Sequence, residues 1–191
     1  MTQITILGTG TMGTAIAAVA AKGGHPVQQL GSSDTGTAVT GDVVVLAVPY
    51  PAVGAIVEKR GEQLAGKVVV DITNPLDFAT FDRLVVAADS SATAEIAAAL
   101  PSSHVVKAFN TTFAATLASG SVGPLTTTVL VAGDDTDAKA TVAAIATSGG
   151  LTAIDAGPLA RARELEAIGF LQITLAAGER VAWTGGFGVV A

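Results

Sequence analysis

Cysteine is absent from this 191-residue sequence. Disulfide bonds, thiol catalysis and zinc–thiolate sites are therefore excluded. Aromatic residues make up only 4% of the chain, whereas hydrophobic residues make up 50%. The core must accordingly be built mainly from Ala, Val, Ile and Leu, whose small side chains suit helices packed closely on a parallel sheet.

Charge and long apolar runs are also scarce. Charged residues make up 14% of the chain, the formal net charge is −6, and no basic run stands out, so a nucleic-acid partner is not expected. No stretch is long and apolar enough to span a bilayer. The first residues enter a strand-like run without a signal region, so we expect a cytoplasmic protein with no membrane partner. The length predicts one domain over residues 1–191.

The most informative motif lies in the first thirteen residues. The apolar run Ile4–Leu7 leads directly into Gly8-Thr9-Gly10-Thr11-Met12-Gly13, and apolar residues at helical spacing follow until Gly23-Gly24. This pattern predicts a buried strand, a glycine turn and a helix. Such a unit binds dinucleotides, because Gly8 permits the tight turn, Gly10 lets the backbone approach a pyrophosphate, and Gly13 lets the helix pack closely on the strand. The helix N-terminus attracts the phosphates.

The end of the second predicted strand, Val27–Leu30, bears on cofactor choice. An NAD site usually places Asp or Glu there to bind the ribose 2′-hydroxyl, but this strand runs into Gly31-Ser32-Ser33-Asp34. The hydroxyls of Ser32 and Ser33 can hydrogen-bond a 2′-phosphate, which favours NADP. No Arg or Lys is nearby in the sequence and Asp34 is close, so NAD stays an alternative.

The rest of the chain alternates between predicted strands and helices. Further strands are expected at 43–48, 67–71, 104–107, 126–132 and 151–155, and helices at 52–60, 90–100, 112–117, from about 134 to Gly149, and 159–177. We expect about one helical turn in 35–42 and loops at 76–89 and 120–124. The last helix has a predicted apolar face, made of Leu165, Ile168, Leu171, Gln172 and Leu175. This alternation predicts a Rossmann-type α/β fold, with a doubly wound, mainly parallel sheet, helices on both faces, and a C-terminal helix and tail at 159–191.

Motifs for hydrolysis or metal binding are missing. There is no GxSxG, and neither of the two histidines accompanies a plausible nucleophile. A dinucleotide site without an evident acid or base fits direct hydride transfer, in which the cofactor supplies the chemistry and the protein supplies orientation and a dry pocket.

Several segments together resemble the family of NADP-dependent oxidoreductases that reduce coenzyme F420, which is related to the reductase domain of the Steap metalloreductases. They occur in family order along nearly the whole chain. The segments are Ile6-Leu7-Gly8-Thr9-Gly10-Thr11-Met12-Gly13, Leu30-Gly31-Ser32-Ser33, Leu46-Ala47-Val48-Pro49, Val69-Val70-Asp71-Ile72-Thr73-Asn74-Pro75, Val105-Val106-Lys107-Ala108-Phe109-Asn110-Thr111, Val131-Ala132-Gly133-Asp134-Asp135 and Ile154-Asp155-Ala156-Gly157-Pro158-Leu159.

The resemblance implies a site for NADP and coenzyme F420. It implies NADP on Thr9 to Met12, with the 2′-phosphate near Ser32 and Ser33. It implies nicotinamide contacts from Val48, Pro49, Asn74, Ala108, Phe109 and Asn110. The deazaflavin would lie over the nicotinamide, walled by loop residues and the glycine-rich tail, and a homodimer is expected, with the last helix and tail as its interface.

Two departures from the family pattern affect the nucleotide site. The family often has Arg after the first Ser of the second strand, where this chain has Ser33, and the following segment is shorter here. For the acidic tail of F420, the candidate cations are Arg161 and Arg163.

Other functions share the same nucleotide motif. The acceptor could be a flavin, a quinone, a carbonyl or an imine, and the chain could also be a redox sensor without catalysis. A titratable group over the nicotinamide would favour carbonyl or imine reduction, whereas a flat, apolar-walled slot would favour a ring acceptor.

Overall fold

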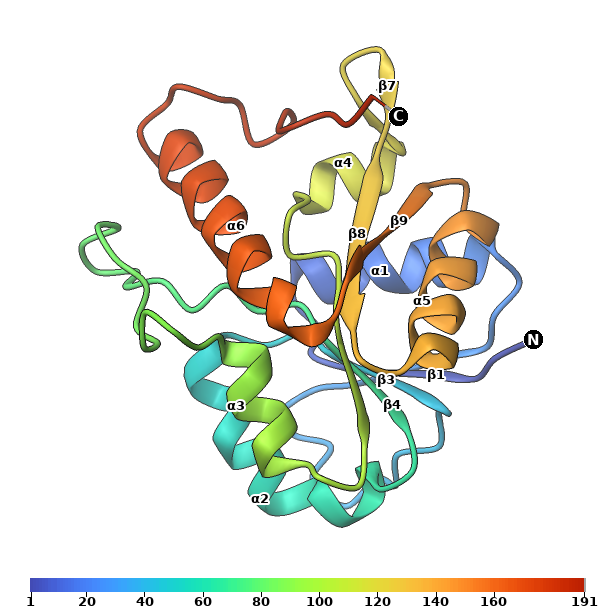
Figure 1. The fold of residues 1–191 in the computed structure, drawn as a ribbon. Coiled ribbons are helices and arrows are strands. Elements are labelled where there is room, and N and C mark those ends of the chain that lie inside the picture. The colour runs from blue at the N-terminus through green and yellow to red at the C-terminus, as the bar shows by residue number, and fades with distance from the viewer. Residues whose placement is uncertain (191) are drawn as a thin grey trace.

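A seven-stranded sheet forms the centre of the protein in the computed structural model, which describes residues 1–190 (Figure 1). Its strand order is β2-β1-β3-β4-β5-β8-β9. The strands are β1 (Ile4–Leu7), β2 (Val27–Leu30), β3 (Val43–Leu46), β4 (Val68–Asp71), β5 (His104–Lys107), β8 (Thr128–Gly133) and β9 (Thr152–Gly157). Strands β1 to β5 are parallel, whereas β8 runs antiparallel to β5 and carries β9 parallel to itself. The prediction of a mainly parallel sheet is confirmed.

The two faces of the sheet are covered by different helices. The apolar run of β3 alternates between them, with Val43 and Val45 in one core and Val44 and Leu46 in the other. The first core packs against α1 (Thr11–Lys22), α4 (Ala114–Ser119) and α5 (Thr136–Ser148), and the second against α2 (Val53–Leu64) and α3 (Ala92–Ala99). Continuous apolar strands thus specify a sheet that is buried on both sides, and the doubly wound architecture is confirmed.

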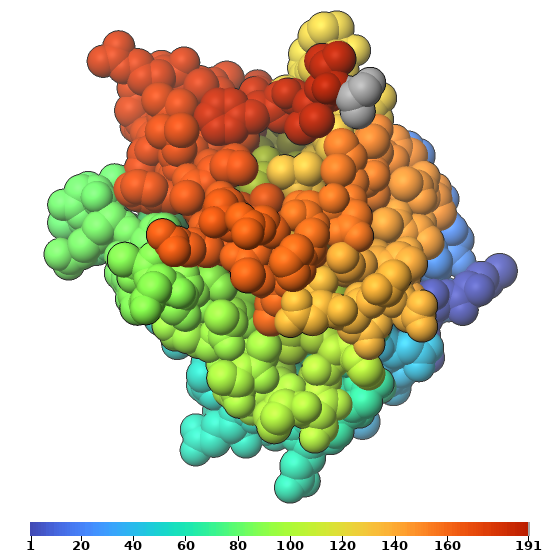
Figure 2. Space-filling model, in the orientation of Figure 1, coloured from blue at the N-terminus to red at the C-terminus, as the bar shows by residue number. Residues whose placement is uncertain are grey.

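The C-terminal helix α6 (Ala162–Ala177) follows a short 3₁₀ turn, η2 (Leu159–Arg161), and contacts α3 and β8. The predicted face of α6 is confirmed at Leu165 and Gln172, which are buried, but it is wrong at Leu171, which is 51% exposed, and it omitted Glu166, which is fully buried. Beyond α6, the tail crosses the top of the molecule in Figure 2 toward the small hairpin of β6 (Ser121–Val122) and β7 (Leu125–Thr126). The tail lacks regular structure up to residue 190, and Ala191 lies outside the described residues.

Three local predictions differ from the structure. Residues 35–42 contain turns but no helical turn, and the loop expected at 120–124 contributes to the β6–β7 hairpin. Strand β3 ends at Leu46, and Pro49 then precedes a 3₁₀ turn, η1 (Tyr50–Ala52), that leads into α2. Within residues 1–190, no helix combines the length and the hydrophobicity needed to cross a membrane.

Candidate functional site

The glycine turn lies at the point where the strand order reverses, since β2 and β3 flank β1 on opposite sides. Ligands of open α/β sheets bind at such a point, beyond the carboxyl ends of the strands. A Cβ on Gly8, which has φ +130°, would lie 2.0 Å from the Ala47 carbonyl oxygen, and one on Gly13 would lie 2.4 Å from the Gly8 oxygen. A Cβ on Gly10 would have no protein atom within 4 Å. Gly8 and Gly13 therefore serve the fold, whereas Gly10 leaves space for a ligand.

Helix α1 starts at this turn with its N-terminus free. Gly10 is the N-cap, no side chain caps the helix, and its first turn has no acidic residue. The N–H groups of Thr11, Met12 and Gly13 precede the first intrahelical donor, Thr14, which donates to the Gly10 oxygen over 2.9 Å. Uncapped amides and the helix dipole form a ready site for a phosphate.

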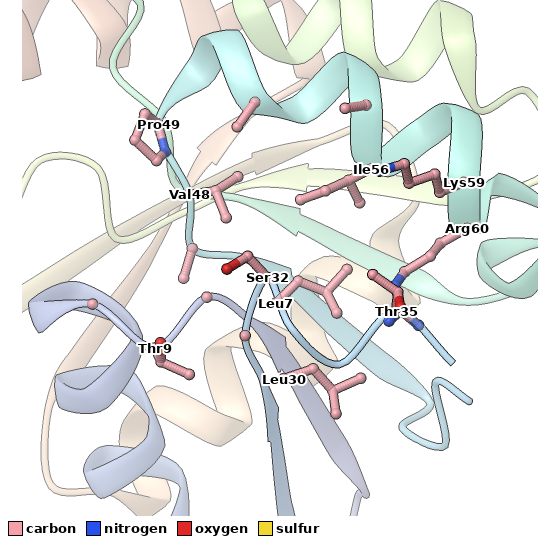
Figure 3. A pocket seen from close by; sticks show the side chains of 16 residues that line it. Leu7, Thr9, Leu30, Ser32, Thr35, Val48, Pro49, Ile56, Lys59 and Arg60 are labelled. Atoms are coloured by element: carbon pink, nitrogen blue, oxygen red, sulfur yellow. The ribbon is translucent and has the colours of Figure 1, made fainter. Parts of the chain in front are cut away.

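A first cavity of about 440 Å³ opens on one side of the turn (Figure 3). The predicted site residues that line it are Gly8, Thr9, Gly10, Ser32, Val48 and Pro49. Ser33 is not among the lining residues, and the hydroxyl of Thr35 takes part in its place.

Two cations of α2, Lys59 and Arg60, complete the lining of the first cavity. No Arg or Lys is near Ser32 in the sequence, but the fold brings these two cations to the same cavity across a β-strand and half of a helix. The expected parallel sheet could have indicated this proximity, because β3 pairs with β1 and the helix after β3 then lies beside the end of β2. No Asp or Glu is present among the lining residues of the described chain.

A second cavity, of about 410 Å³, lies on the other side of the α1 N-terminus and is lined there by Thr11 and Met12. Its walls are apolar and aromatic, and none of its lining residues within 1–190 is Asp, Glu, Lys, Arg, His or Tyr. The aromatic residues are Phe78 and Phe81 from the loop after β4, Phe113 before α4, and Trp183 from the tail. The rings of Phe113 and Trp183 lie 5.0 Å apart between centroids. Sequence reasoning placed a loop and the tail here but named none of these aromatic side chains.

Two predicted residues, Asn74 and Asn110, lie together on the wall of the second cavity. The Asn110 amide nitrogen donates to Asn74 Oδ1 over 2.9 Å and to the Leu165 carbonyl over 2.8 Å. These two bonds fix the orientation of the amide, and Asn110 Oδ1 is a buried acceptor without a partner among the described residues. A buried acceptor of this kind is costly unless a ligand donor or a water reaches it.

The turn before Asn110 is strained. Phe109 has φ +62°, which is rare for a bulky residue, and both Ala108 and Phe109 are buried in the core and line neither cavity. Backbone strain concentrates at functional sites, where the surroundings hold it in place. In this turn, Ala108 and Phe109 position Asn110, whose side chain reaches the cavity.

A buried charged network lies beside this wall, and the sequence analysis missed it. Lys107 Nζ donates to Asp71 Oδ2 over 2.9 Å, to Glu166 Oε1 over 3.0 Å and to the Thr73 carbonyl over 2.6 Å, and all three ionic side chains are essentially inaccessible. Glu166 also accepts the backbone N–H groups of Ala92 and Thr93 at the start of α3. Asp71 and Lys107 are direct cross-strand neighbours, so opposite charges at the ends of two adjacent predicted strands were the available signal.

Tyr50 is the titratable group that follows Pro49 directly. Its hydroxyl donates to Glu95 of α3, and burial, followed by the neighbouring Glu95 carboxylate, raises its pKa above the usual range for tyrosine. The phenol therefore stays protonated at physiological pH. It lines neither cavity.

Comparison with known proteins identifies the family. Residues 28–75 match the family model described as NADP oxidoreductase, coenzyme F420-dependent. The F420-dependent NADP reductase of Methanocaldococcus jannaschii is 36% identical over 150 residues, which cover 76% of this chain and 67% of that protein. The chain belongs to this F420-dependent NADP oxidoreductase family.

Two further comparisons, one of structure and one of sequence, extend this result. A crystal structure of a proposed F420-dependent NADP-reductase from Arthrobacter sp. FB24 superposes over 100% of both chains, with a TM-score of 0.87 and 28% identity. The metalloreductase STEAP3 of Rattus norvegicus is 41% identical over 108 residues, which are 56% of this chain but only 21% of that protein. The Arthrobacter structure covers every element of the fold, including α6 and the tail.

Proposed function

We propose that this protein transfers a hydride between NADP(H) and the deazaflavin of coenzyme F420. The observation that supports it is the second cavity, which is apolar, aromatic and free of ionisable lining residues in the described chain. A ring acceptor needs flat, apolar walls, and its reduced form is stabilised by its own electronics. Reduction of a carbonyl or an imine instead calls for a proton donor at the reacting atom.

The residues of the first cavity and the glycine turn fit a dinucleotide. The uncapped amides at Thr11 to Gly13 would hold the pyrophosphate, and the open space at Gly10 would let it approach the backbone. Ser32 would contact the ribose phosphate, while Val48 and Pro49 would border the nicotinamide. The unpartnered Asn110 Oδ1 would then accept an N–H of the nicotinamide carboxamide.

When bound, the two rings supply the redox chemistry, in which a hydride moves between nicotinamide C4 and deazaflavin C5. The chain's residues orient the rings and exclude water. Met12 and Phe113 contribute apolar surface to the second cavity, and the Asn74–Asn110 pair fixes one polar contact at its wall. No side chain acts as a general acid or base in this proposal.

A steady-state assay of the purified protein tests the proposal. We expect NADPH to reduce F420, followed by the deazaflavin absorbance, much faster than NADH does, and we expect free flavin, quinones and imines to be reduced slowly at best. Binding of NADPH without reduction of F420 would contradict the proposed acceptor. Failure to reduce any acceptor would instead favour a nucleotide sensor.

We also propose that residues 1–191 act as one domain in a cytoplasmic homodimer, where the tail forms one wall of the acceptor site. Trp183 lines the second cavity, and exposed apolar side chains lie on α6 and the tail, among them Leu171 and Val190. An interface between two copies of the chain would cover these side chains. Sedimentation velocity at micromolar concentration should give the mass of a dimer, and a monomer would contradict this part of the proposal.

A further inference from the structure

The segment after β2 is closed by its own turn instead of a crossover helix. The Asp34 carboxylate accepts the Gly31 N–H over 2.8 Å, and the Asp34 N–H donates back to the Gly31 carbonyl over 3.2 Å. Asp34 is therefore engaged with the backbone of its own loop and does not line the first cavity. Asp34 is the carboxylate near the end of β2 that could have bound a ribose 2′-hydroxyl in an NAD site, but here it stabilises the loop.

Arg60 fixes the same loop from the other side. Its guanidinium reaches across from α2, donating to the Thr37 carbonyl over 2.6 Å and to the Asp34 carbonyl. Arg60 is only 9% exposed, and Figure 3 shows it extending from α2 to the loop beside Thr35. Both terminal nitrogens of the guanidinium thus donate to backbone carbonyls of this loop, so Arg60 is a positioning residue that sets where Ser32 and Thr35 lie.

Lys59, one residue earlier on α2, lines the cavity without being engaged. Its side chain is exposed, and among residues 1–190 no hydrogen bond or ion pair holds its ammonium group. Figure 3 shows it beside Ile56 on the α2 side of the cavity, with the loop of Ser32 and Thr35 below. A free ammonium group, two hydroxyls and no lining carboxylate form a site for a dianion in a chain whose net charge is −6.

We infer that Lys59 is the residue that recognises the 2′-phosphate of NADP, with Ser32 and Thr35 as hydrogen-bond donors and Arg60 as their positioning residue. This inference rests on the proposed function, because it assigns a role within the same nucleotide site. A phosphate oxygen that accepts from an ammonium group forms a charge-assisted hydrogen bond, which is about twice as strong as a neutral one. NAD carries a hydroxyl at that position and gains no such bond. The cation that selects the phosphate thus comes from the helix after β3, because residues 31–42 between β2 and β3 contain no Lys or Arg.

Isothermal titration calorimetry of the full chain with small probes tests this role separately from catalysis. Adenosine 2′,5′-bisphosphate carries the 2′-phosphate, whereas 5′-AMP does not. For Lys59→Ala we expect the Kd of the bisphosphate to rise roughly tenfold, the effect of losing one charge-assisted bond, while the Kd of 5′-AMP stays the same. Lys59→Arg should keep most of the affinity. Lys22→Ala, which removes an exposed lysine at the far end of α1, is the matched control for net charge.

Each outcome of this experiment is decisive. A Lys59→Ala protein that binds the bisphosphate as tightly as the wild type would overturn the inference while leaving the NADP site intact. An equal loss for both probes would overturn it as well, since the effect would not depend on the 2′-phosphate. If the wild type binds neither NADPH nor the bisphosphate, the proposed function fails, and the inference fails with it.

Discussion

The two cavities beside the glycine turn have similar volumes, about 440 and 410 Å³, but the chain builds them in different ways. The first is lined only by residues between 7 and 60, which come from the ends of β1 and β2, the segments that follow β1, β2 and β3, and α2. The second combines the α1 N-terminus with segments near residues 72–81, 110–115, 173 and 183. The first cavity is thus a local supersecondary unit, and the second depends on contacts between distant parts of the chain.

This difference extends to what holds each wall. The first cavity is fixed by backbone contacts at Gly8 and Gly13 and by the hydrogen bonds from Arg60 to the loop after β2. The wall of the second cavity is supported by the network of Asp71, Lys107 and Glu166, which joins β4 and β5 to α6 and to the start of α3. In the proposed assignment, the nucleotide therefore binds in a locally built cavity. The acceptor binds in a cavity whose loop and tail side chains can change without disturbing the sheet.

Removal of the buried cation should have the largest effect. Lys107→Met leaves Asp71 and Glu166 buried without their counter-ion, so we expect the free energy of unfolding to fall by about 3–5 kcal/mol. Urea denaturation followed by circular dichroism measures this loss. Because the network supports the second cavity, the folded variant should also lose more of its affinity for F420 than of its affinity for adenosine 2′,5′-bisphosphate, each relative to the wild type.

A half-exposed ion pair supplies the control for this variant. Lys139 Nζ lies 2.8 Å from the Asp155 carboxylate, whose side chain is 59% exposed. Lys139→Met should cost less than about 1 kcal/mol, since exposed ion pairs contribute little. Equal losses for the two lysine variants would show that the buried network has no special role.

Gly10→Val should abolish nucleotide binding while leaving the fold intact. A side chain at this position meets no protein atom within 4 Å, but it fills the path of the pyrophosphate. We expect NADPH affinity to fall by about 100-fold or more, because a steric clash of this kind costs about 3 kcal/mol. Calorimetry measures the binding and thermal unfolding checks the fold.

Gly13→Val is the contrasting variant, since its Cβ would lie 2.4 Å from the Gly8 oxygen. It should lower the unfolding temperature, which Gly10→Val should not do. Unchanged NADPH binding in a folded Gly10→Val protein would rule out the assignment of the nucleotide to this turn.

These two glycines also show how far the sequence could predict the molecule. The first half follows from local signals, because continuous apolar strands, glycine breaks and helical spacing are all encoded within a few residues. The direction of β8 does not follow, since its pairing with β5 is set by the α4 segment and the β6–β7 hairpin between them and not by any periodicity.

The same limit explains the misplaced face of α6. Leu171 was expected inside because it is apolar, but the buried face carries Glu166, which bonds Lys107, beside the expected Gln172, whose Oε1 accepts the Phe187 N–H over 3.1 Å. Polar side chains buried with their partners are invisible to a hydrophobic pattern. For this reason the sequence predicted Asn74 and Asn110 by motif but not the network or the aromatic walls.

Trp183→Ala should weaken acceptor binding by about tenfold, because it removes one aromatic wall and its contact with Phe113. The KM for F420 should rise, while the Kd of NADPH should stay the same. Trp183→Phe should recover most of the loss. An unchanged KM for F420 in the alanine variant would exclude the tail as a wall of the acceptor site.

Acidification should produce the smallest effect, and it should be confined to the second cavity. The Asp77 carboxylate accepts the Ala79 N–H over 3.0 Å and lies 3.0 Å from an Arg83 nitrogen, and the backbone bond, followed by Arg83, lowers its pKa below the usual 3.8. These bonds tie down the loop of Phe78 and Phe81, in which Phe81 is held at φ +56°. Because the folded pKa is lowered, the ordering by Asp77 is complete above pH 3.8 and is lost as the pH falls through the folded value.

Fluorescence of Trp183, the single tryptophan, reports on this cavity directly. Quenching by oxidised F420 should weaken about twofold between pH 5 and pH 3 in the wild type. The change is small because the Arg83 side chain of the ion pair is 69% exposed, and exposed ion pairs contribute little. Asp77→Asn should show the weaker binding already at pH 5 and a flatter pH profile. Binding of 5′-AMP to the first cavity serves as the reference, since Asp77 does not line it. If the Asn variant keeps the wild-type profile, Asp77 does not control the loop. If 5′-AMP binding instead weakens as much as F420 binding does, the two cavities do not differ in their response to acid.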